Sequence, residues 1–383
     1  MQPKLPHSKT IHDKQLRISS ILLSFKKTHK NTPGIKIRPI VSNNNSPTTK
    51  VSWLLQHLLV NLLDTVPAHL KSSEELIDTI KNLNQSTTQT YNYPYSLDVV
   101  ALYTSIPPQD AINIIQNRLK NKTFNYFGLN SNNIELLLKC VLVNTYFVFN
   151  NKTYRQISGL PMGNCLSGTL AIIFMDELEK KVLLNNTVGL YKRYIDDIFI
   201  LSENKQKAEE FHYVMNHQHP NIKFEIEHPD HKNSLNLLDF NIKLNGTAPP
   251  IFSFYKKPAL RDIFLHYNSA LPTSMKQNVI SNELKRIHDR CSEPEQLSKA
   301  KKEFYQKLQT TNYPDNFIKQ RNSRQKQKGK PKTTTNNVYY FNFPFPYDNI
   351  QNKIIFFYGL KSPLPNFAFM TIFFFKIVGL KQK

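Results

Sequence analysis

The sequence predicts an α+β fold in which an antiparallel sheet is backed by helices. First, β-prone segments and amphipathic helices follow one another irregularly along the chain. Second, short polar turns separate two pairs of β-prone segments, at residues 150–151 and 195–196, as they do in antiparallel hairpins. Third, the chain has no internal repeat and no regular alternation of strand and helix, which disfavours a doubly wound parallel sheet.

The N-terminal third predicts two strands and one long helix. Residues 34–42, "GIKIRPIVS", have alternating apolar positions after a Pro-Gly turn and predict a strand. Residues 51–66 place their leucines on one broad face at helical spacing, which predicts a helix packed on the core. Residues 95–107 predict a strand that ends in a turn at Pro107 and Pro108.

The remaining elements alternate between helices and hairpin strands. We expect helices at residues 110–120 and 208–218 and from Leu166 onward. A further helix begins near residue 134 and is followed by the hairpin at 150–151. We expect strands at 222–228 and 237–244. Residues 319–332 contain seven basic residues and no acid, which indicates a linker or a nucleic-acid or nuclear-import arm. The last thirty residues have no clear periodicity.

The charge balance points to a polyanionic partner. The chain has 383 residues, with 50 Lys and Arg against 28 Asp and Glu, for a formal net charge of +22. Phosphate contacts by basic side chains release counterions, so a nucleic acid is the expected partner, with a cationic membrane-surface protein as the alternative. The three cysteines, Cys140, Cys165 and Cys291, are too far apart for a disulfide framework and indicate a reducing compartment.

The sequence gives no sign of secretion or membrane insertion. Its first residues lack the apolar region of a secretory signal. The most apolar stretch, residues 366–380, is interrupted by Lys376 and falls short of the ~20 residues that a spanning helix needs. We therefore expect no membrane partner and an intracellular protein, nuclear in preference to cytoplasmic because of the basic arm.

Two adjacent aspartates, Asp196 and Asp197, lie in the predicted turn of "YKRYIDDIFILS". Two carboxylates ~4 Å apart repel each other by about 4 kcal/mol at an effective dielectric constant of about 20. A hard divalent cation such as Mg²⁺, which prefers oxygen ligands, would relieve that repulsion. The alternative is an ordinary solvated turn.

A third carboxylate, Asp98, ends the β-prone run "YSLD". If the strand that contains Asp98 lies beside the Asp196 hairpin, three acids converge. Two metal ions ~3.5–4 Å apart can then clamp an in-line phosphoryl displacement, activating a primer hydroxyl and neutralising the leaving pyrophosphate. The net charge suits such a reaction, because template, primer and nucleotide are all polyanions.

Other residues have the chemistry of nucleotide contacts. Arg38 and Lys27 would bind a triphosphate, Arg38 in bidentate fashion, or else are surface charges. Tyr103, five residues past Asp98, either lies beneath the sugar of an incoming nucleotide, where it would reject a 2′-hydroxyl, or belongs to the core. The glycines of "GLPMGN", residues 159–164, would allow close approach to a base pair or form a tight connection between strand and helix.

Five segments in order resemble a known family. "SLDVVALYTSIP", "QISGLPMGNCLSGTLAIIFMDELE" and "YKRYIDDIF" are similar to motifs A, B and C of reverse transcriptases, and "GIKIRPIVS" to the preceding fingers motif. "LYTSIP", "NLLDFNI" and "FSFYKKPALRDIFLHYNSALPTSMKQNVI" resemble more specifically the reverse transcriptases of Penelope-like retroelements. The resemblance extends from residue 22 to 280, and more weakly to about 354.

The resemblance implies a right-hand polymerase with an antiparallel palm sheet. It implies fingers at residues 1–90, a palm at 91–255 with a finger insertion at about 108–150, and a thumb-like region at 256–318. Residues 319–337 would be the basic linker, and 338–383 a connector remnant with an unplaced tail. The region from Tyr255 would contact primer and template.

The resemblance also implies roles for single residues. It implies metal-site roles for the catalytic acids Asp98, Asp196 and Asp197, and for the backbone carbonyl of Val99. Nucleotide contacts are implied at Lys27 and Arg38, at the sugar gate Tyr103, and at Gln156 and Gly163 in the nucleotide and template pocket. Two Mg²⁺ ions, which Mn²⁺ can replace, would be the cofactors, and an RNA template, a DNA primer and deoxynucleoside triphosphates the partners.

The sequence departs from the family at several positions. Where the family reads "MGSPLSP", this chain reads "MGNCLSG", with Asn164, Cys165 and Gly168. No segment resembles the GIY-YIG endonuclease that follows the reverse transcriptase in this family. We therefore expect a reverse transcriptase core, and keep as alternatives an inactive relic that only binds nucleic acid and an unrelated basic RNA-binding module.

Two further features of the sequence raise the question of zinc binding and of nucleophilic catalysis. Four histidines, His217, His219, His228 and His231, fall within fifteen residues, but their spacing matches no zinc pattern, and solvated loop histidines are the expected interpretation. Cys165 has no base placed beside it by the sequence, so we expect packing instead of nucleophilic catalysis.

Overall fold

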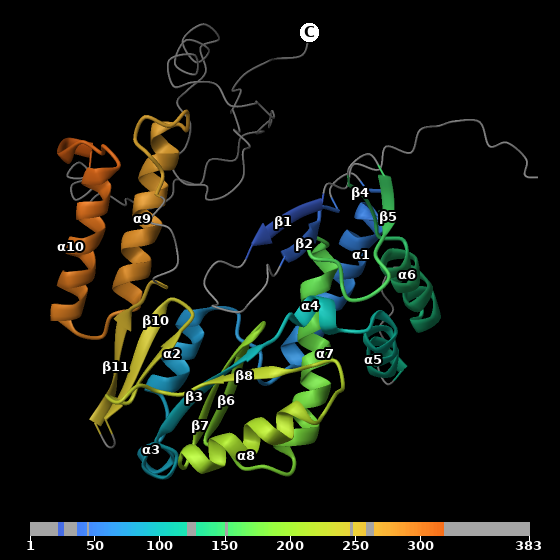
Figure 1. Ribbon diagram of the computed structural model, residues 1–383, viewed down its shortest axis with the longest axis horizontal. Helices are drawn as coiled ribbons and strands as arrows, with labels where there is room; N and C mark the ends of the chain where they lie inside the picture. The colour runs from blue at the N-terminus through green and yellow to red at the C-terminus, as the bar shows by residue number, and fades with distance from the viewer. Residues whose placement is uncertain are drawn as a thin grey trace, which may run out of the picture. The chain divides into compact units, whose positions relative to one another are not determined.

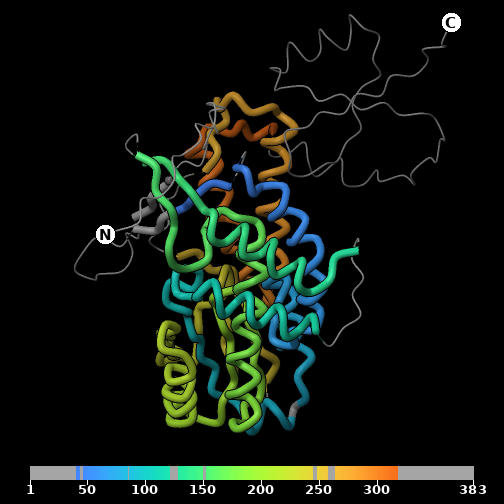
Figure 2. The backbone as a smooth tube through the Cα atoms, turned by 90° about the vertical axis from the view of Figure 1, so that its right-hand side faces the viewer, coloured from blue at the N-terminus to red at the C-terminus, as the bar shows by residue number. Residues whose placement is uncertain are grey.

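The computed structural model describes residues 22–26, 37–43, 46–120, 128–149, 152–245, 248–257 and 264–317. The chain divides into two compact units, Met1–Pro250 and Ile251–Lys383, and the boundary falls inside strand β11 (Ala248–Phe254). Figure 1 shows the helices and strands of each unit, and Figure 2 follows the course of the backbone in a second view. The predicted boundaries of fingers, palm and thumb remain predictions.

A four-stranded antiparallel sheet is the centre of the first unit. Its strand order is β6 (Leu190–Tyr194), β7 (Asp197–Ser202), β3 (Tyr93–Val99), β8 (Phe224–Glu227). Alternate side chains of a strand point to opposite faces. One face buries Tyr95, Leu97, Val99, Ile198 and Ile200 in the main hydrophobic core. The opposite face therefore contains Asp98 and Asp197.

Helices complete that core. They are α1 (Thr49–Leu59), the 3₁₀ helix η1 (Val60–Thr65), α5 (Pro108–Lys120), α6 (Ser131–Val143), α7 (Cys165–Leu183) and α8 (Lys205–Asn216). The 19-residue helix α7 is buried on nearly all sides, which explains its continuous apolar sequence. Its N-cap is Asn164, whose side chain accepts a hydrogen bond from the backbone N–H of Leu166 (3.0 Å).

Short helices and hairpins surround the central sheet. Helices α2 (Ser73–Lys81) and α3 (Gln85–Thr90) precede β3, and α4 (Leu102–Ser105) follows it. Strands β1 (Leu22–Lys26) and β2 (Ile37–Val41) form one antiparallel pair, and β4 (Tyr146–Phe149) and β5 (Lys152–Arg155) another. A three-stranded sheet has the order β11, β10 (Phe240–Asn245), β9 (Ser234–Leu237).

The expected strand at residues 95–107 is too long. Strand β3 ends at Val99, Ala101 adopts a left-handed conformation with φ of 53°, and the short helix α4 follows. Tyr103 therefore lies on a helical turn instead of a strand. The apolar run "VVAL" misled the prediction because strand and helix burial are not distinguishable over so few residues.

The expected strand at residues 237–244 is in fact a hairpin. Leu238 has a φ of 53°, and the chain reverses there so that Phe240 pairs with Leu237. The continuous apolar pattern spans both strands, because each contributes buried residues on either side of the turn. Nothing in the local composition signals the turn except Asp239.

The second unit contains a pair of helices, α9 (Thr273–Asp289) and α10 (Pro294–Thr310). They lie side by side (Figure 1) around a small core of Ile280, Ile287, Phe304, Leu308 and Tyr313. A short connection of four residues joins them, and Pro294 begins the second helix, where its missing N–H costs no hydrogen bond.

No helix in the described ranges is long and apolar enough to cross a membrane. The apolar stretch at residues 366–380, the basic run at 319–332 and Lys27 lie outside the described residues.

Gly163 provides a first prediction, on stability. Its φ is 108°, and a Cβ there would overlap the carbonyl group of Val41. We expect Gly163→Ala to lower the free energy of unfolding by well over the roughly 1–2 kcal/mol that left-handed backbone costs an L-residue. Gly128 is the matched control, because it has a φ of 71° with nothing within 4 Å of the added Cβ.

Urea denaturation of both variants measures the difference. Gly128→Ala should show only the conformational penalty, so the additional destabilisation in Gly163→Ala reports the clash with β2. Equal destabilisation of the two variants would show that the loop at Gly163 can move away from β2 without cost.

Candidate active site at the β6–β7 hairpin

The register of the central sheet places two predicted acids side by side. Asp98 on β3 pairs directly with Asp197 on β7. Directly paired residues of an antiparallel sheet have their Cβ atoms ~4.5–5.5 Å apart and project to the same face. On the other side of Asp98, Glu225 of β8 occupies the paired position, so three acidic residues lie in one row across the sheet.

The turn between β6 and β7 contains the third predicted acid. Tyr194 pairs with Asp197, which leaves Ile195 and Asp196 as a two-residue turn, as the sequence predicts. Ile195 has a φ of 57°, a strained value for a β-branched side chain. The carbonyl of Asp196 accepts a hydrogen bond from the backbone N–H of Val99 (3.1 Å), which ties the turn to the end of β3.

A buried ion pair supports this turn from below. Arg193 on β6 is fully buried and forms a salt bridge with Glu179 of α7, whose side chain is 1% exposed. Its Nη1 donates a hydrogen bond to the carbonyl of Ile195 (3.1 Å), and its Nη2 donates to the carbonyl of Ile172 (3.0 Å). The hydroxyl of Tyr191 donates a further hydrogen bond to Glu179 (3.0 Å).

The electrostatics of this cluster keep Arg193 charged. Burial alone lowers the pKa of Arg193, but the charge and hydrogen bond of Glu179 outweigh it, and the net shift is upward. Burial, followed by the charge of Glu179, raises the pKa of Tyr191 well above its usual value. Arg193 is therefore charged and the phenol of Tyr191 neutral at physiological pH.

Tyr103 lies near the acids, on helix α4. Burial raises the pKa of its half-buried phenol, and the negative charge of Asp196 raises it further. Its hydroxyl lies near Gly168 of α7: the distance between the hydroxyl oxygen and an ideal Cβ atom built on Gly168 is 3.9 Å. Tyr103 is thus neutral, close to Asp196, and packed partly against the main core.

The loop before α7 contacts two distant segments through its glycines. A Cβ on Gly159 would lie 2.6 Å from the Cα of Thr104, and Gly163 meets the backbone of Val41. In this structure the glycines permit a close approach to the chain's own backbone. The Gln156 amide donates hydrogen bonds to the carbonyls of Ser158 (2.9 Å) and Gly159 (3.2 Å) and so holds this loop.

Of the two residues predicted to contact the triphosphate, the structure describes only the backbone of Arg38. Arg38 is part of strand β2 and pairs with Phe25 of β1. Val41, at the end of the same strand, donates a hydrogen bond to the carbonyl of Met162 (2.8 Å), so β2 is joined to the loop that contains Gly163. Lys27 lies outside the described residues, as does the side chain of Arg38.

The donor set suits a hard divalent cation in its chemistry. Every predicted ligand offers an oxygen atom, which such a cation prefers. The ligands are the carboxylates of Asp98 and Asp197, the side chain of Asp196 at the adjoining turn, and the carbonyl of Val99 at the end of β3. Within the described residues, no three His, Cys, Asp or Glu side chains are grouped closely enough to hold a metal ion as they stand. The backbone thus places the predicted metal ligands next to one another, but their side chains are not arranged closely enough to bind a metal ion.

The four clustered histidines have separate surroundings where the structure gives their contacts. Nδ1 of His217 lies 2.7 Å from the carbonyl of Tyr213, and His219 lies 3.5 Å from Asp110. His228 contacts Tyr93 and Glu209 at 3.0 and 2.8 Å. Each of these three histidines thus has a different partner.

Sequence reasoning missed Arg193, Glu179 and Glu225. Arg193 lies inside the quoted hairpin, but a basic residue on a short strand gives no sign that it is buried. Glu179 belongs to "DELE", which follows the apolar run of residues 170–175, and an acid next to such a run is a signal of a buried ion pair. Glu225 belongs to an alternating strand and is exposed.

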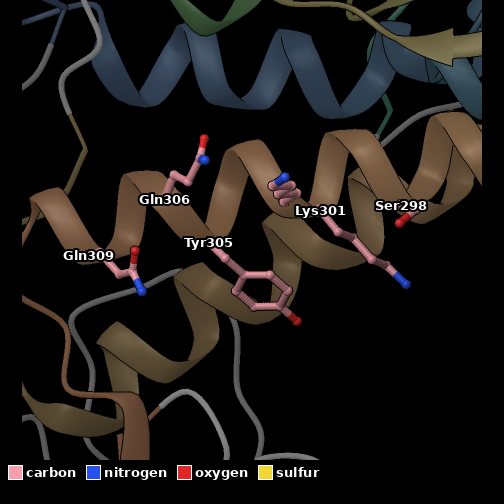
Figure 3. Close-up of a pocket in the computed structure, with 6 residues that line it drawn as sticks. Ser298, Lys301, Tyr305, Gln306 and Gln309 are labelled. Carbon is pink, nitrogen blue, oxygen red and sulfur yellow. The ribbon is translucent and has the colours of Figure 1, made fainter.

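Helix α10 of the second unit presents a concave polar surface. Its lining residues recur at helical spacing along one helix: Ser298, Lys301, Lys302, Tyr305, Gln306 and Gln309. In Figure 3, Lys301, Tyr305 and Gln309 project to the same side of the helix. Two lysines, an aromatic ring and two amides on one surface have the chemistry of nucleic-acid contacts, although a solvated helix face has the same composition.

Comparison with known proteins places the chain in a family. The model of the reverse transcriptase (RNA-dependent DNA polymerase) family matches residues 26–232, more than half of the chain. The chain therefore belongs to the reverse transcriptase family. A second family model, the animal helix-turn-helix domain, matches residues 263–323, which include α9 and α10. A search of curated proteins found no match.

Solved structures agree on the fold. Telomerase from Candida albicans, in complex with a fragment of telomeric RNA, matches with a TM-score of 0.52 and 11% identity over 76% of this chain and 56% of that one. Telomerase from Candida tropicalis, truncated from its C-terminal domain, gives a TM-score of 0.43 and 14% identity over 62% of this chain and 55% of that one. The chain thus spans about half the length of these telomerases. The match to the Candida albicans structure supports the fold, which is that of the right-hand polymerases.

Proposed function

We propose that the chain is an RNA-directed DNA polymerase that extends a DNA primer on an RNA template, using deoxynucleoside triphosphates and two Mg²⁺ ions, which Mn²⁺ can replace. One observation carries this proposal: the direct pairing of Asp98 with Asp197, beside the turn that contains Asp196. Membership of the reverse transcriptase family supplies the reaction. The net charge of +22 supports polyanionic partners.

Each residue of the site has a proposed task. Asp98, Asp196, Asp197 and the carbonyl of Val99 would hold the metal ions, which lower the pKa of the primer hydroxyl and neutralise the pyrophosphate when bound. Arg38 and Lys27 would bind the triphosphate. Gln156 orders the 158–159 loop, and Gly163 lets that loop reach β2, so both would shape the nucleotide and template pocket.

We further propose that the chain derives from a Penelope-like retroelement. The motifs "LYTSIP" and "NLLDFNI" and the block from Phe252 to Ile280 support this origin. The helix-turn-helix match over 263–323 agrees with a nucleic-acid role for α9 and α10, and the basic run at 319–332 supports a nuclear protein. These helices would be thumb-like and would contact primer and template.

A primer-extension assay tests the proposed function. The full chain is given a labelled DNA primer annealed to RNA, or to DNA of the same sequence, with Mg²⁺ or Mn²⁺. Incorporation on the RNA template supports a reverse transcriptase. Tight binding of the hybrid with no incorporation in either metal would instead identify an inactive relic.

Tyr103 provides a second prediction, on sugar selectivity. Its ring lies close to Asp196, and burial and that charge both raise the pKa of its phenol. If it stands beneath the sugar, Tyr103→Ala or Tyr103→Val should relax discrimination against ribonucleotides by about 10- to 200-fold, the usual range for one shape-selective pocket contact. The ratio of kcat/KM for deoxy- and ribonucleotides measures the effect.

Tyr103→Phe is the matched control, because it keeps the ring and removes only the hydroxyl. We expect it to preserve discrimination. Unchanged discrimination in Tyr103→Ala, with incorporation intact, would leave Tyr103 as a core residue alone.

A further inference from the structure

The β4–β5 ribbon is an exposed two-stranded sheet with an aromatic face. Phe147 pairs with Tyr154, and Phe149 pairs with Lys152. Since alternate residues share a face, these four side chains lie together on one side of the ribbon. The rings of Phe147 and Tyr154 stack with centroids 5.5 Å apart and planes 16° from parallel. Phe149 is 55% exposed and Tyr154 42% exposed.

So much exposed aromatic surface is unusual on a short ribbon that packs little into the core. All four residues of β5 are exposed, and β4 is only half-buried in its middle. Figure 1 shows both strands apart from the four-stranded sheet, beyond the end of α6. Exposed apolar patches of this kind mark interaction sites in folded proteins.

The surrounding charge favours a polyanion on this face. Residues 136–175 contain no Asp or Glu, whereas Lys152 and Arg155 lie on the exposed strand itself. Aromatic rings interleaved with basic side chains are the usual means of holding single-stranded nucleic acid, because every base can stack on a ring and each phosphate can pair with a cation.

The ribbon is joined to the candidate active site by backbone hydrogen bonds. The N–H of Gln156 donates to the carbonyl of Thr145 (2.9 Å) and extends the ladder by one residue. The next residues form the loop that packs on α4, where the N–H of Leu160 donates to the carbonyl of Tyr103 (2.6 Å). Only a short loop therefore connects the ribbon to the proposed nucleotide pocket.

We propose that the aromatic face of the β4–β5 ribbon binds the unpaired template RNA by base stacking. This proposal rests on the proposed polymerase function for the identity of its ligand. Phe149 and Tyr154 would supply the stacking surface, and Lys152, on the same face, a phosphate contact. A ribbon that holds the template ahead of the site limits its motion before each base is read.

Binding of labelled hybrids by the full chain, without nucleotides, tests the proposal. One hybrid has a blunt end and the other a 5′ overhang of about ten nucleotides of template RNA, a length within the usual site sizes for single strands, and fluorescence anisotropy gives both affinities. Phe149→Ala/Tyr154→Ala should weaken binding of the overhang hybrid by at least about fivefold, since stacking is worth about 5- to 150-fold per base. Binding of the blunt hybrid should be unchanged.

Tyr213→Ala is the matched control, because Tyr213 is 66% exposed on α8. It should change neither affinity. In Lys152→Gln, the slope of log affinity against log salt for the overhang hybrid should become shallower by about 0.7, the contribution of one phosphate that is no longer neutralised.

Three outcomes would overturn the proposal. They are unchanged affinity for the overhang in the aromatic double variant, an equal decrease in affinity for both hybrids, and a dimer that dissociates in that variant while RNA affinity stays the same. The last would assign the ribbon to an interface between copies of the chain. Because these measurements need no catalysis, a chain that prefers the overhang but never extends the primer contradicts only the proposed polymerase function.

Discussion

Replacing Asp197 with asparagine should reduce nucleotide incorporation by about 10³-fold or more while hybrid binding persists. The substitution keeps the size of the side chain and removes the charge from one half of the Asp98–Asp197 pair. A bound metal ion supplies several kcal/mol of charge stabilisation to such a reaction, and each step of about 1.4 kcal/mol corresponds to tenfold in rate. Single-turnover primer extension under saturating nucleotide measures the decrease.

Asp98→Asn should have a similar effect, and the double variant should be little worse than either single variant. Residues that act as one unit are strongly non-additive, because removing either abolishes the same interaction. Asp64→Asn is the control, since Asp64 is a surface aspartate paired with Lys71 at 3.1 Å, and its side chain is 69% exposed. Incorporation that survives in both Asp98→Asn and Asp197→Asn would refute the assignment of the catalytic pair.

A thermal measurement separates metal binding from catalysis. A ligand that binds only the folded state, at about 100 times its Kd, stabilises that state by about 2.7 kcal/mol. Mn²⁺ should therefore raise the melting temperature of the wild type and of Asp64→Asn, and raise it less in Asp197→Asn. An identical shift in all three proteins would place the bound ion elsewhere.

Arg193→Met should lower the free energy of unfolding by about 3–5 kcal/mol, the usual cost of removing one partner of a buried ion pair. It would leave the Glu179 carboxylate, which is 1% exposed, with Tyr191 as its remaining hydrogen-bond partner in this cluster. The turn at Ile195 would also lose the hydrogen bond from Nη1. Urea denaturation measures the change, which is a large part of a typical total stability of about 5–15 kcal/mol.

A double-mutant cycle distinguishes charge from packing. Arg193→Met/Glu179→Met should be less destabilised than Arg193→Met alone, because no buried charge remains unpaired. The surface pair Lys71–Asp64 gives the comparison: its side chains are 72% and 69% exposed, and Lys71→Met should cost about 1 kcal/mol or less. A double variant as unstable as the sum of its single variants would show that Arg193 and Glu179 are not coupled.

Substitution of Arg193 should also reduce catalysis. Arg193→Lys keeps a positive charge but cannot make the hydrogen bonds to Glu179, Ile172 and Ile195 at once. We expect it to lower kcat with little change in KM for the nucleotide, because the turn that contains Asp196 would be less well fixed. A stable Arg193→Lys protein with unchanged kcat would limit Arg193 to a structural role.

Much of the site follows from local sequence signals. The apolar arms on either side of Ile195 and Asp196 predict the hairpin, and the structure confirms it. The helix expected from Leu166 begins one residue earlier, at Cys165, and the mixture of hairpins and helices predicts the α+β fold that the comparisons support. These elements are recognisable because their hydrophobic periods are long and uninterrupted.

Other features were not readable from the sequence. The turn at Leu238 splits an apparently continuous strand, and Tyr103 lies on a helical turn because Ala101 reverses the chain. The glycines at 159 and 163 serve contacts with Thr104 and Val41, which are distant in sequence. Such contacts depend on segments that meet only in the folded chain, so local composition contains no signal for them.

The sequence by itself determined which acids are available, where the strands that contain them begin, and that the chain carries a large positive charge. Only the tertiary structure decided that Asp98 and Asp197 occupy paired positions, with Glu225 on the other side of Asp98. Only it showed that Arg193 of β6 is buried and donates a hydrogen bond to the turn between β6 and β7. The physical reason is that strand order and register are set by packing of whole elements, whereas the sequence specifies each element mainly through its own hydrophobic pattern.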